Sequence, residues 1–181
     1  MNILFDTEQS RYDVLKVNKR IIDMCGLKEQ PDNFQSYSLR QYTPEERLLI
    51  IDYILKETKN IGYVIIDGIR DLINDINNID QSIDITTKLM QWTDQYNCHI
   101  SVGLHLNKGQ NAELRGHLGS EIQNKAESII EIEKDPDNDK WNIIKARDFR
   151  RIQFDSIGMT IDENYFPVID QDYVEKNNKN F

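Results

Sequence analysis

The segment Ile61-Gly-Tyr-Val-Ile-Ile-Asp-Gly-Ile-Arg-Asp-Leu72 decides the fold class of this chain. Its apolar positions Tyr63 to Ile66 form a short run, rich in β-branched residues, that ends abruptly at Asp67. Such a run, bounded by Gly62 and Gly68, predicts a strand that is buried on both faces, as in a parallel sheet. Open α/β sheets bind ligands beyond the carboxyl ends of their strands. The segment therefore predicts an α/β fold with a functional site near Asp67.

The composition predicts a globular protein with one main domain. The chain has 181 residues, of which 39% are hydrophobic and 29% charged, and we expect a core over residues 1–170 and a polar tail over 171–181. The net charge of −9 argues against a surface that binds nucleic acid throughout, but it allows a local basic patch. Two widely spaced cysteines predict buried, reduced thiols. No signal peptide or membrane-spanning run is apparent, so we expect a cytoplasmic protein that does not enter a membrane.

Strand and helix signals alternate along the chain. Ser10 is a helix N-cap, and Thr43-Pro-Glu-Glu46 is a capping box with proline at the first helical position. This alternation predicts a mostly parallel sheet flanked by helices, with an antiparallel hairpin added at its C-terminal edge. The expected strands are 2–5, 34–39, 63–67, 98–104 and 128–133, and the last of these pairs with 141–147 in the hairpin.

Two further carboxylates, Asp6 and Glu8, follow the first expected strand. If that strand lies beside the strand of Asp67, the carboxylates converge, so that one can hold a metal and another can polarise an attacking water. The alternative is a plain loop in which Ser10, aided by Asp6, caps a helix. Asp67 would then be a polar residue that simply ends a strand.

Several basic side chains also occupy informative positions. His105 lies just past the strand 98–104, where it can touch a phosphate, although it can equally be a surface histidine. Lys145 and Arg147 are two apart and therefore share one face of a strand. They are suited to a phosphate of a neighbouring subunit's nucleotide or of nucleic acid. Alternatively, they protect an exposed edge strand by positive charge. Lys108 and Arg115 lie in a polar, glycine-bearing segment that we expect to be a mobile loop.

The order of these motifs resembles the RecA/DnaB-type ATPase core, and most closely the RepA-like ATPases of plasmids and mobile elements. Each motif alone is weak, but five in order are fairly specific, and they span about Ile3 to Pro167. The matching segments are Leu4-Phe-Asp-Thr-Glu-Gln-Ser10, Val64-Ile-Ile-Asp-Gly-Ile-Arg-Asp-Leu72, Ile100-Ser-Val-Gly-Leu-His105, Leu114-Arg-Gly-His-Leu-Gly-Ser-Glu121 running into Ala126-Glu-Ser-Ile-Ile-Glu131, and Ile143-Ile-Lys-Ala-Arg147.

The resemblance implies a role for each residue of the expected site. Glu8 matches the catalytic glutamate, and Asp67 matches the Walker B aspartate that holds Mg²⁺. His105 falls where the family keeps a polar sensor of the terminal phosphate. The family also implies ATP as the nucleotide and a role in DNA replication or mobilisation.

The resemblance also implies partners. The loop with Lys108 and Arg115 matches the segment that faces DNA, which we expect to be single-stranded. Lys145 and Arg147 match the basic pair that acts as trans-acting fingers across a subunit interface. We accordingly expect a homo-oligomer, which in this family is a hexameric ring.

One family element is missing from the sequence. No G-x-x-x-x-G-K-[ST] phosphate-binding loop occurs in these residues, and in the family it would precede Met1. We therefore expect a RecA-like core without its N-terminal segment, which by itself binds little or no ATP. Two alternatives stay open. One is a nucleotide-dead module for oligomerisation or DNA binding. The other is an unrelated α/β enzyme that uses Asp6, Glu8 and Asp67 as a metal cluster.

Overall fold

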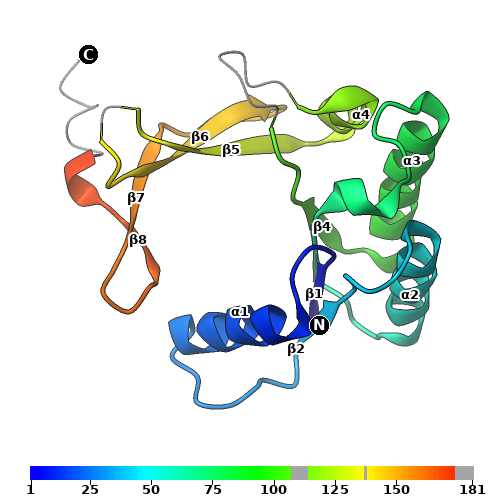
Figure 1. Cartoon of the computed structure of the whole chain (residues 1–181), viewed down its shortest axis with the longest axis horizontal. Helices are drawn as coiled ribbons and strands as arrows, with labels where there is room; N and C mark the ends of the chain where they lie inside the picture. The colour runs from blue at the N-terminus through cyan, green and yellow to red at the C-terminus, as the bar shows by residue number, and fades with distance from the viewer. Residues whose placement is uncertain (107–113, 137, 174–181) are drawn as a thin grey trace. The chain divides into compact units, whose positions relative to one another are not determined.

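The computed structural model describes residues 1–106, 114–136 and 138–173. The chain divides into two compact units, Met1–Asn124 and Lys125–Phe181, rather than forming one core over residues 1–170. Each unit has its own sheet (Figure 1).

Unit 1 is built on a four-stranded parallel sheet with strand order β2-β1-β3-β4. The strands are β1 (Asn2–Asp6), β2 (Phe34–Ser38), β3 (Tyr63–Asp67) and β4 (His99–Val102). Helices lie between them in the chain, because neighbouring parallel strands need a crossover connection. The prediction of an α/β fold with a parallel sheet flanked by helices is confirmed for this unit.

The helices of unit 1 begin largely where the capping signals predict. They are α1 (Arg11–Met24), α2 (Pro44–Glu57), the 3₁₀ turn η1 (Ile69–Leu72), α3 (Ile79–Tyr96) and α4 (Gly116–Lys125). The Ser10 cap and the complete Thr43 capping box are both present. α3 begins at Ile79 because Asn78 caps it, with its side chain accepting a hydrogen bond from the Gln81 amide at 3.0 Å. α4 begins at Gly116, inside the segment expected to be a loop.

The core of unit 1 lies between the sheet and helices α2 and α3. Phe5, Val64 and Ile66 are fully buried in the sheet, and Ile51 and Leu55 of α2 are fully buried as well. The apolar run of β3 is thus confirmed as a core strand on the face of Val64 and Ile66, but Tyr63 and Ile65 on the other face are only partly buried, so the prediction of full burial on both faces is wrong. Both cysteines are free, but Cys25 is exposed and Cys98 is only partly buried, so the prediction of two buried thiols is wrong for Cys25 and only partly met for Cys98.

Unit 2 contains a four-stranded antiparallel sheet in the order β5-β6-β7-β8. Its strands are β5 (Ser128–Lys134), β6 (Asn142–Phe149), β7 (Ile157–Ile161) and β8 (Pro167–Ile169). The hairpin of β5 and β6 is present, but its predicted place at the edge of the parallel sheet is wrong. The Ile/Glu alternation of β5 is typical of an antiparallel strand with two different faces, unlike the continuous apolar run of β3.

The two faces of the unit 2 sheet differ in their coverage. On one face the register aligns isoleucines of neighbouring strands, and Ile130 and Ile132 of β5 remain 54% and 61% exposed. On the other face Ile143 is buried. Tyr173 packs closely over Gly158 and meets the ring of Trp141 edge-on at 5.3 Å.

No helix within the described ranges is both long and apolar enough to cross a membrane.

Candidate functional site at the carboxyl edge of the parallel sheet

Three neighbouring strands of unit 1 deliver the predicted site residues to one edge. Asp6 and Asp67 are register partners at the ends of β1 and β3. The Thr7 amide donates to the Asp67 carbonyl at 3.1 Å, and the Gly103 amide after β4 donates to the Ile66 carbonyl at 2.9 Å. Main-chain hydrogen bonds therefore join the ends of β1, β3 and β4. These bonds fix the starting points of the segments that carry Glu8, Asp67 and His105.

Two glycines give the carboxylates room. A Cβ on Gly103 would lie 2.8 Å from Oδ1 of Asp67, so this carboxylate rests against the bare main chain of the β4 loop. Gly68 has a φ of +89° in the left-handed region, and a Cβ there would lie 2.2 Å from Oγ1 of Thr7 and 3.1 Å from Oε1 of Glu8. Gly68 is required for its left-handed dihedral angle as well as for the close approach, whereas a side chain at position 103 would make the Asp67 carboxylate move.

The electrostatics of the edge act mainly on Asp67. Burial raises the pKa of the Asp67 carboxyl, the negative charges of Asp6 and Glu8 raise this pKa further, and His105 lowers it. A carboxylate that is partly desolvated beside other carboxylates favours a proton or a bound cation. Asp67 is thus a residue of this edge at which an added positive charge would be favourable.

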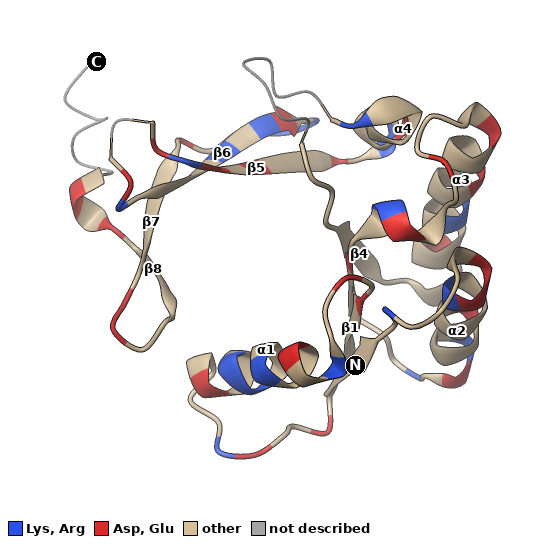
Figure 2. Ribbon diagram, viewed as in Figure 1, with Lys and Arg blue, Asp and Glu red and all other residues tan. Residues whose placement is uncertain are grey.

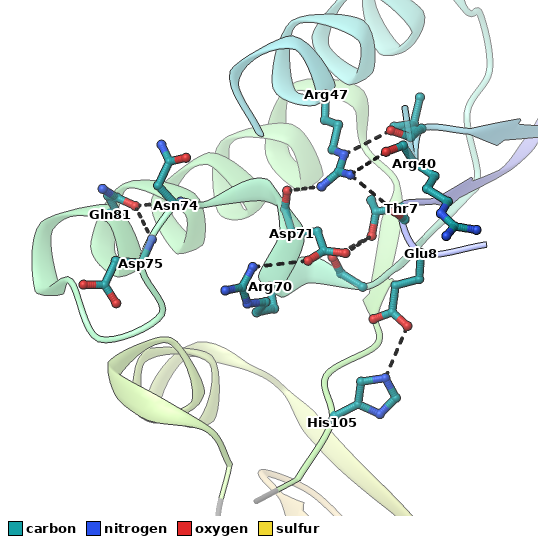
Figure 3. A network of polar contacts seen from close by, with 12 residues as sticks. Thr7, Glu8, Arg40, Arg47, Arg70, Asp71, Asn74, Asp75, Gln81 and His105 are labelled. Atoms are coloured by element: carbon teal, nitrogen blue, oxygen red, sulfur yellow. Dashed lines mark hydrogen bonds and ion pairs between the residues drawn. The ribbon is translucent and has the colours of Figure 1, made fainter. Parts of the chain in front are cut away.

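Glu8 and His105 meet across the mouth of the site. Nε2 of His105 lies 3.3 Å from Oε2 of Glu8, and the two come from the loops after β1 and β4 (Figure 3). Both side chains are substantially exposed, so this pair is accessible to a ligand. The structure thus brings together Glu8, Asp67 and His105, although they are far apart in the sequence.

Asp6 has a structural role instead. It is only 1% exposed, and its Oδ1 accepts hydrogen bonds from the amides of Glu8 at 3.0 Å and Gln9 at 2.7 Å. These bonds hold the loop that presents Glu8, while the cap of α1 is made by Ser10, whose side chain accepts from the Asp13 amide at 3.2 Å. Across the described ranges, no group of three or more His, Cys, Asp or Glu side chains is placed to hold a metal ion. The arrangement therefore does not favour a cluster of Asp6, Glu8 and Asp67.

Arg47 of α2 is a central residue of this edge that the sequence analysis missed. Its guanidinium donates to the carbonyls of Leu39 at 3.0 Å, Arg40 at 3.0 Å, Asp71 at 2.6 Å and Thr7 at 3.4 Å (Figure 3). It thereby joins the loops after β1 and β2 to η1. The sequence contained one signal for this role. The helix dipole disfavours a cation near the start of a helix, so an arginine there indicates that its side chain makes contacts outside the helix.

Thr7 is a second residue that the sequence analysis passed over. It is almost fully buried, and its hydroxyl lies 3.0 Å from the carbonyls of both Asp67 and Gly68 and 3.2 Å from Oδ2 of Asp71. It therefore fixes the start of the loop that carries Glu8 against the end of β3.

The predicted basic residues lie elsewhere. Lys145 and Arg147 are on β6, whose pairing with β5 includes this part of the strand, whereas its register with β7 covers Asn142 to Ile144. The alternative of an edge strand therefore stays open at these two residues. Lys145 pairs with Glu133, and Nη1 of Arg147 lies 2.9 Å from Oε2 of Glu131. Their role as trans-acting fingers stays a prediction. Arg115 is exposed just before α4, and Lys108 lies outside the described residues.

The edge thus combines a carboxyl suited to a cation, a second carboxylate that can accept a proton from water, and an imidazole in contact with it. This set is suited to hydrolysis at a phosphate ester or anhydride. No protein-family model matches this sequence, and no curated protein matches it.

Proposed function

We propose that unit 1 is the hydrolytic part of a RecA-like ATPase domain, from a protein of DNA replication or mobilisation. The observation that carries the proposal is the convergence of Glu8, Asp67 and His105 from β1, β3 and β4 at one carboxyl edge. This is where open α/β sheets place their ligands.

The residues would divide the work. Glu8 accepts a proton from the attacking water as the bond between the β–γ bridging oxygen and the terminal phosphorus breaks. His105, in contact with Glu8, is placed to hydrogen-bond that phosphate and to orient the glutamate. Asp67 fits one ligand position of Mg²⁺, because this ion usually takes one or two carboxylates and completes its shell with water and phosphate oxygens. Bound Mg²⁺ would neutralise charge on the phosphates.

The phosphates themselves would be held by a loop that these 181 residues lack. We therefore expect this chain to bind the magnesium–nucleotide complex weakly, in the millimolar range rather than the micromolar range. DNA and further copies of the chain enter the proposal as partners only through the family resemblance.

Paramagnetic relaxation by Mn²⁺·ATP tests the site directly. We expect millimolar Mn²⁺·ATP to broaden the amide resonances of Glu8, Gly68 and His105, and Asp67→Asn to abolish this broadening. Asp94→Asn, on the exposed side of α3, is the matched control and should leave it intact. Broadening that is spread over the surface or unchanged in Asp67→Asn would contradict the proposal. Its complete absence would favour the nucleotide-dead module instead.

A further inference from the structure

The outward side of α1 (Arg11–Met24) differs in charge from the rest of this acidic chain. Four adjacent pairs of residues, at 11–12, 15–16, 19–20 and 23–24, are exposed and form that side of the helix. Four of the eight residues are cations and one is acidic, whereas the whole chain has 22 basic and 31 acidic residues. We name these cations the basic stripe, and the blue segments of α1 in Figure 2 mark them. They are Arg11, Lys16, Lys19 and Arg20.

Helix stability does not account for the basic stripe. Arg11 is in the first turn, where the helix dipole disfavours a cation, and the last turn, where a cation would help, has none. Lys16 and Arg20 are four residues apart, a spacing at which like charges destabilise a helix. Among the residues that the structure describes, the only ion pair of the stripe joins Nζ of Lys16 to Oδ1 of Asp13 at 3.8 Å. The stripe is therefore better explained by an anion outside the chain.

An aromatic ring lies among these cations. Tyr12 is 67% exposed, and Nζ of Lys16 lies 4.2 Å from the centre of its ring. The ring takes no part in the core, which α1 meets on its opposite side through Val14 and Ile22. Cations that neutralise phosphates beside an exposed ring that can stack on a base are the combination found in single-stranded nucleic-acid sites. In a duplex the bases are already stacked on one another, so an exposed tyrosine ring would contribute less binding free energy there.

We propose that the exposed side of α1 binds single-stranded nucleic acid, with the basic stripe on the phosphates and Tyr12 stacked on a base. From Arg11 to Arg20 the helix rises about 14 Å, a length that a few nucleotides of a single strand can span. This binding surface does not depend on the nucleotide site proposed above, and either can fail while the other stands.

Fluorescence anisotropy with a labelled oligothymidylate, titrated with the full chain, tests the surface. The stripe variant Lys16→Gln/Lys19→Gln/Arg20→Gln is compared with Lys56→Gln/Lys59→Gln/Lys125→Gln, which also replaces three exposed cations. Each lowers the net charge by three, from −9 to −12. We expect the stripe variant to bind at least about tenfold more weakly at low salt, and its slope of log affinity against log salt to shrink by about 2. The control variant should stay within about twofold of the parent chain.

The aromatic contact has its own readout. Tyr12→Ala should weaken binding about tenfold without changing the salt slope, whereas Tyr12→Phe should bind like the parent chain. Circular dichroism establishes that each variant is folded.

Several outcomes would overturn the proposal. These are no binding at low salt, equal binding by stripe and control variants, or tighter binding to duplex than to single strands. Phosphatidylserine vesicles that bind α1 without competition from the oligonucleotide would assign the surface to membranes. A change of oligomeric state in the stripe variant without nucleic acid would assign it to a second copy of the chain.

Discussion

At the scale of single residues, the site depends on two glycines, whose lack of a side chain leaves space for the carboxylates. Asp67 lies against Gly103, and Glu8 and Thr7 lie against Gly68. This places negative charges near one another in partly desolvated surroundings, which is unfavourable for the folded chain alone. Functional sites commonly retain such unfavourable arrangements because a ligand relieves them.

The substitution Asp67→Asn should stabilise the fold at neutral pH. Folding raises the pKa of Asp67 above its ordinary value of 3.8, so the ionised carboxylate destabilises the folded state. That penalty is absent at low pH, where the carboxyl is protonated in both states, and it develops as the pH rises through the raised pKa. Thermal melts should therefore show a gain in Tm near pH 7 that shrinks toward about pH 4. A gain in Tm that does not depend on pH, or a loss in Tm, would contradict the conclusion that the ionised Asp67 carboxylate destabilises the folded state.

The substitution Gly68→Ala should destabilise unit 1 by at least about 2 kcal/mol. An alanine at a φ of +89° costs about 1–2 kcal/mol, and its Cβ would also clash with Oγ1 of Thr7. Urea denaturation measures the loss. Gly62→Ala is the matched control, because nothing lies within 4 Å of a Cβ there, and its effect should be small. Equal effects of the two changes would contradict the close packing described at the end of β3.

At the scale of elements, α2 holds the site edge together through one side chain. Arg47 reaches from the start of α2 to carbonyls in three separate segments, after β1, after β2 and in η1, and it sits just after the Thr43 capping box. The helix position therefore determines the loop positions, and through them the site.

Replacing Arg47 by alanine should destabilise unit 1 by about 2–4 kcal/mol, because partly buried carbonyls would lose charged donors. Arg47→Lys should recover only part of this, since an ammonium group cannot match the planar fork of a guanidinium. Chemical denaturation gives the free energies, with Lys56→Ala on the exposed side of α2 as the control. A loss below about 0.5 kcal/mol for Arg47→Ala would mean that water replaces its contacts.

At the scale of the whole molecule, the chain has two sheets with separate cores. Ile51 is buried in unit 1 and Ile143 in unit 2. Ile143→Ala should weaken unit 2 by about 2–4 kcal/mol and raise hydrogen exchange in β5–β7, with β1 and β3 unchanged. Ile51→Ala should do the reverse. Exchange that rises equally in both units for either change would show one cooperative structure.

The sequence predicted some levels of this molecule better than others. Local signals were sufficient for β3, for the Ser10 and Thr43 caps and for the β5–β6 hairpin, because each depends on neighbouring residues. The separate sheet of unit 2 was missed because pairing with β7 and β8 is a long-range choice that periodicity does not encode. The convergence of Glu8 and Asp67 followed from the rule that parallel strands share a carboxyl edge. The Arg47 contacts did not follow from such a rule, because the guanidinium donates to carbonyls whose positions depend on the whole fold.

The contact between Asp67 and Gly103 has an evolutionary consequence. A side chain at position 103 would displace the carboxylate, since its Cβ would lie 2.8 Å from Oδ1. In related sequences these two positions should therefore covary, with glycine retained at 103 wherever an acidic residue stands at 67 and released where it does not. A glycine retained at position 103 would then be explained by the space that the neighbouring carboxylate needs, and not by a turn.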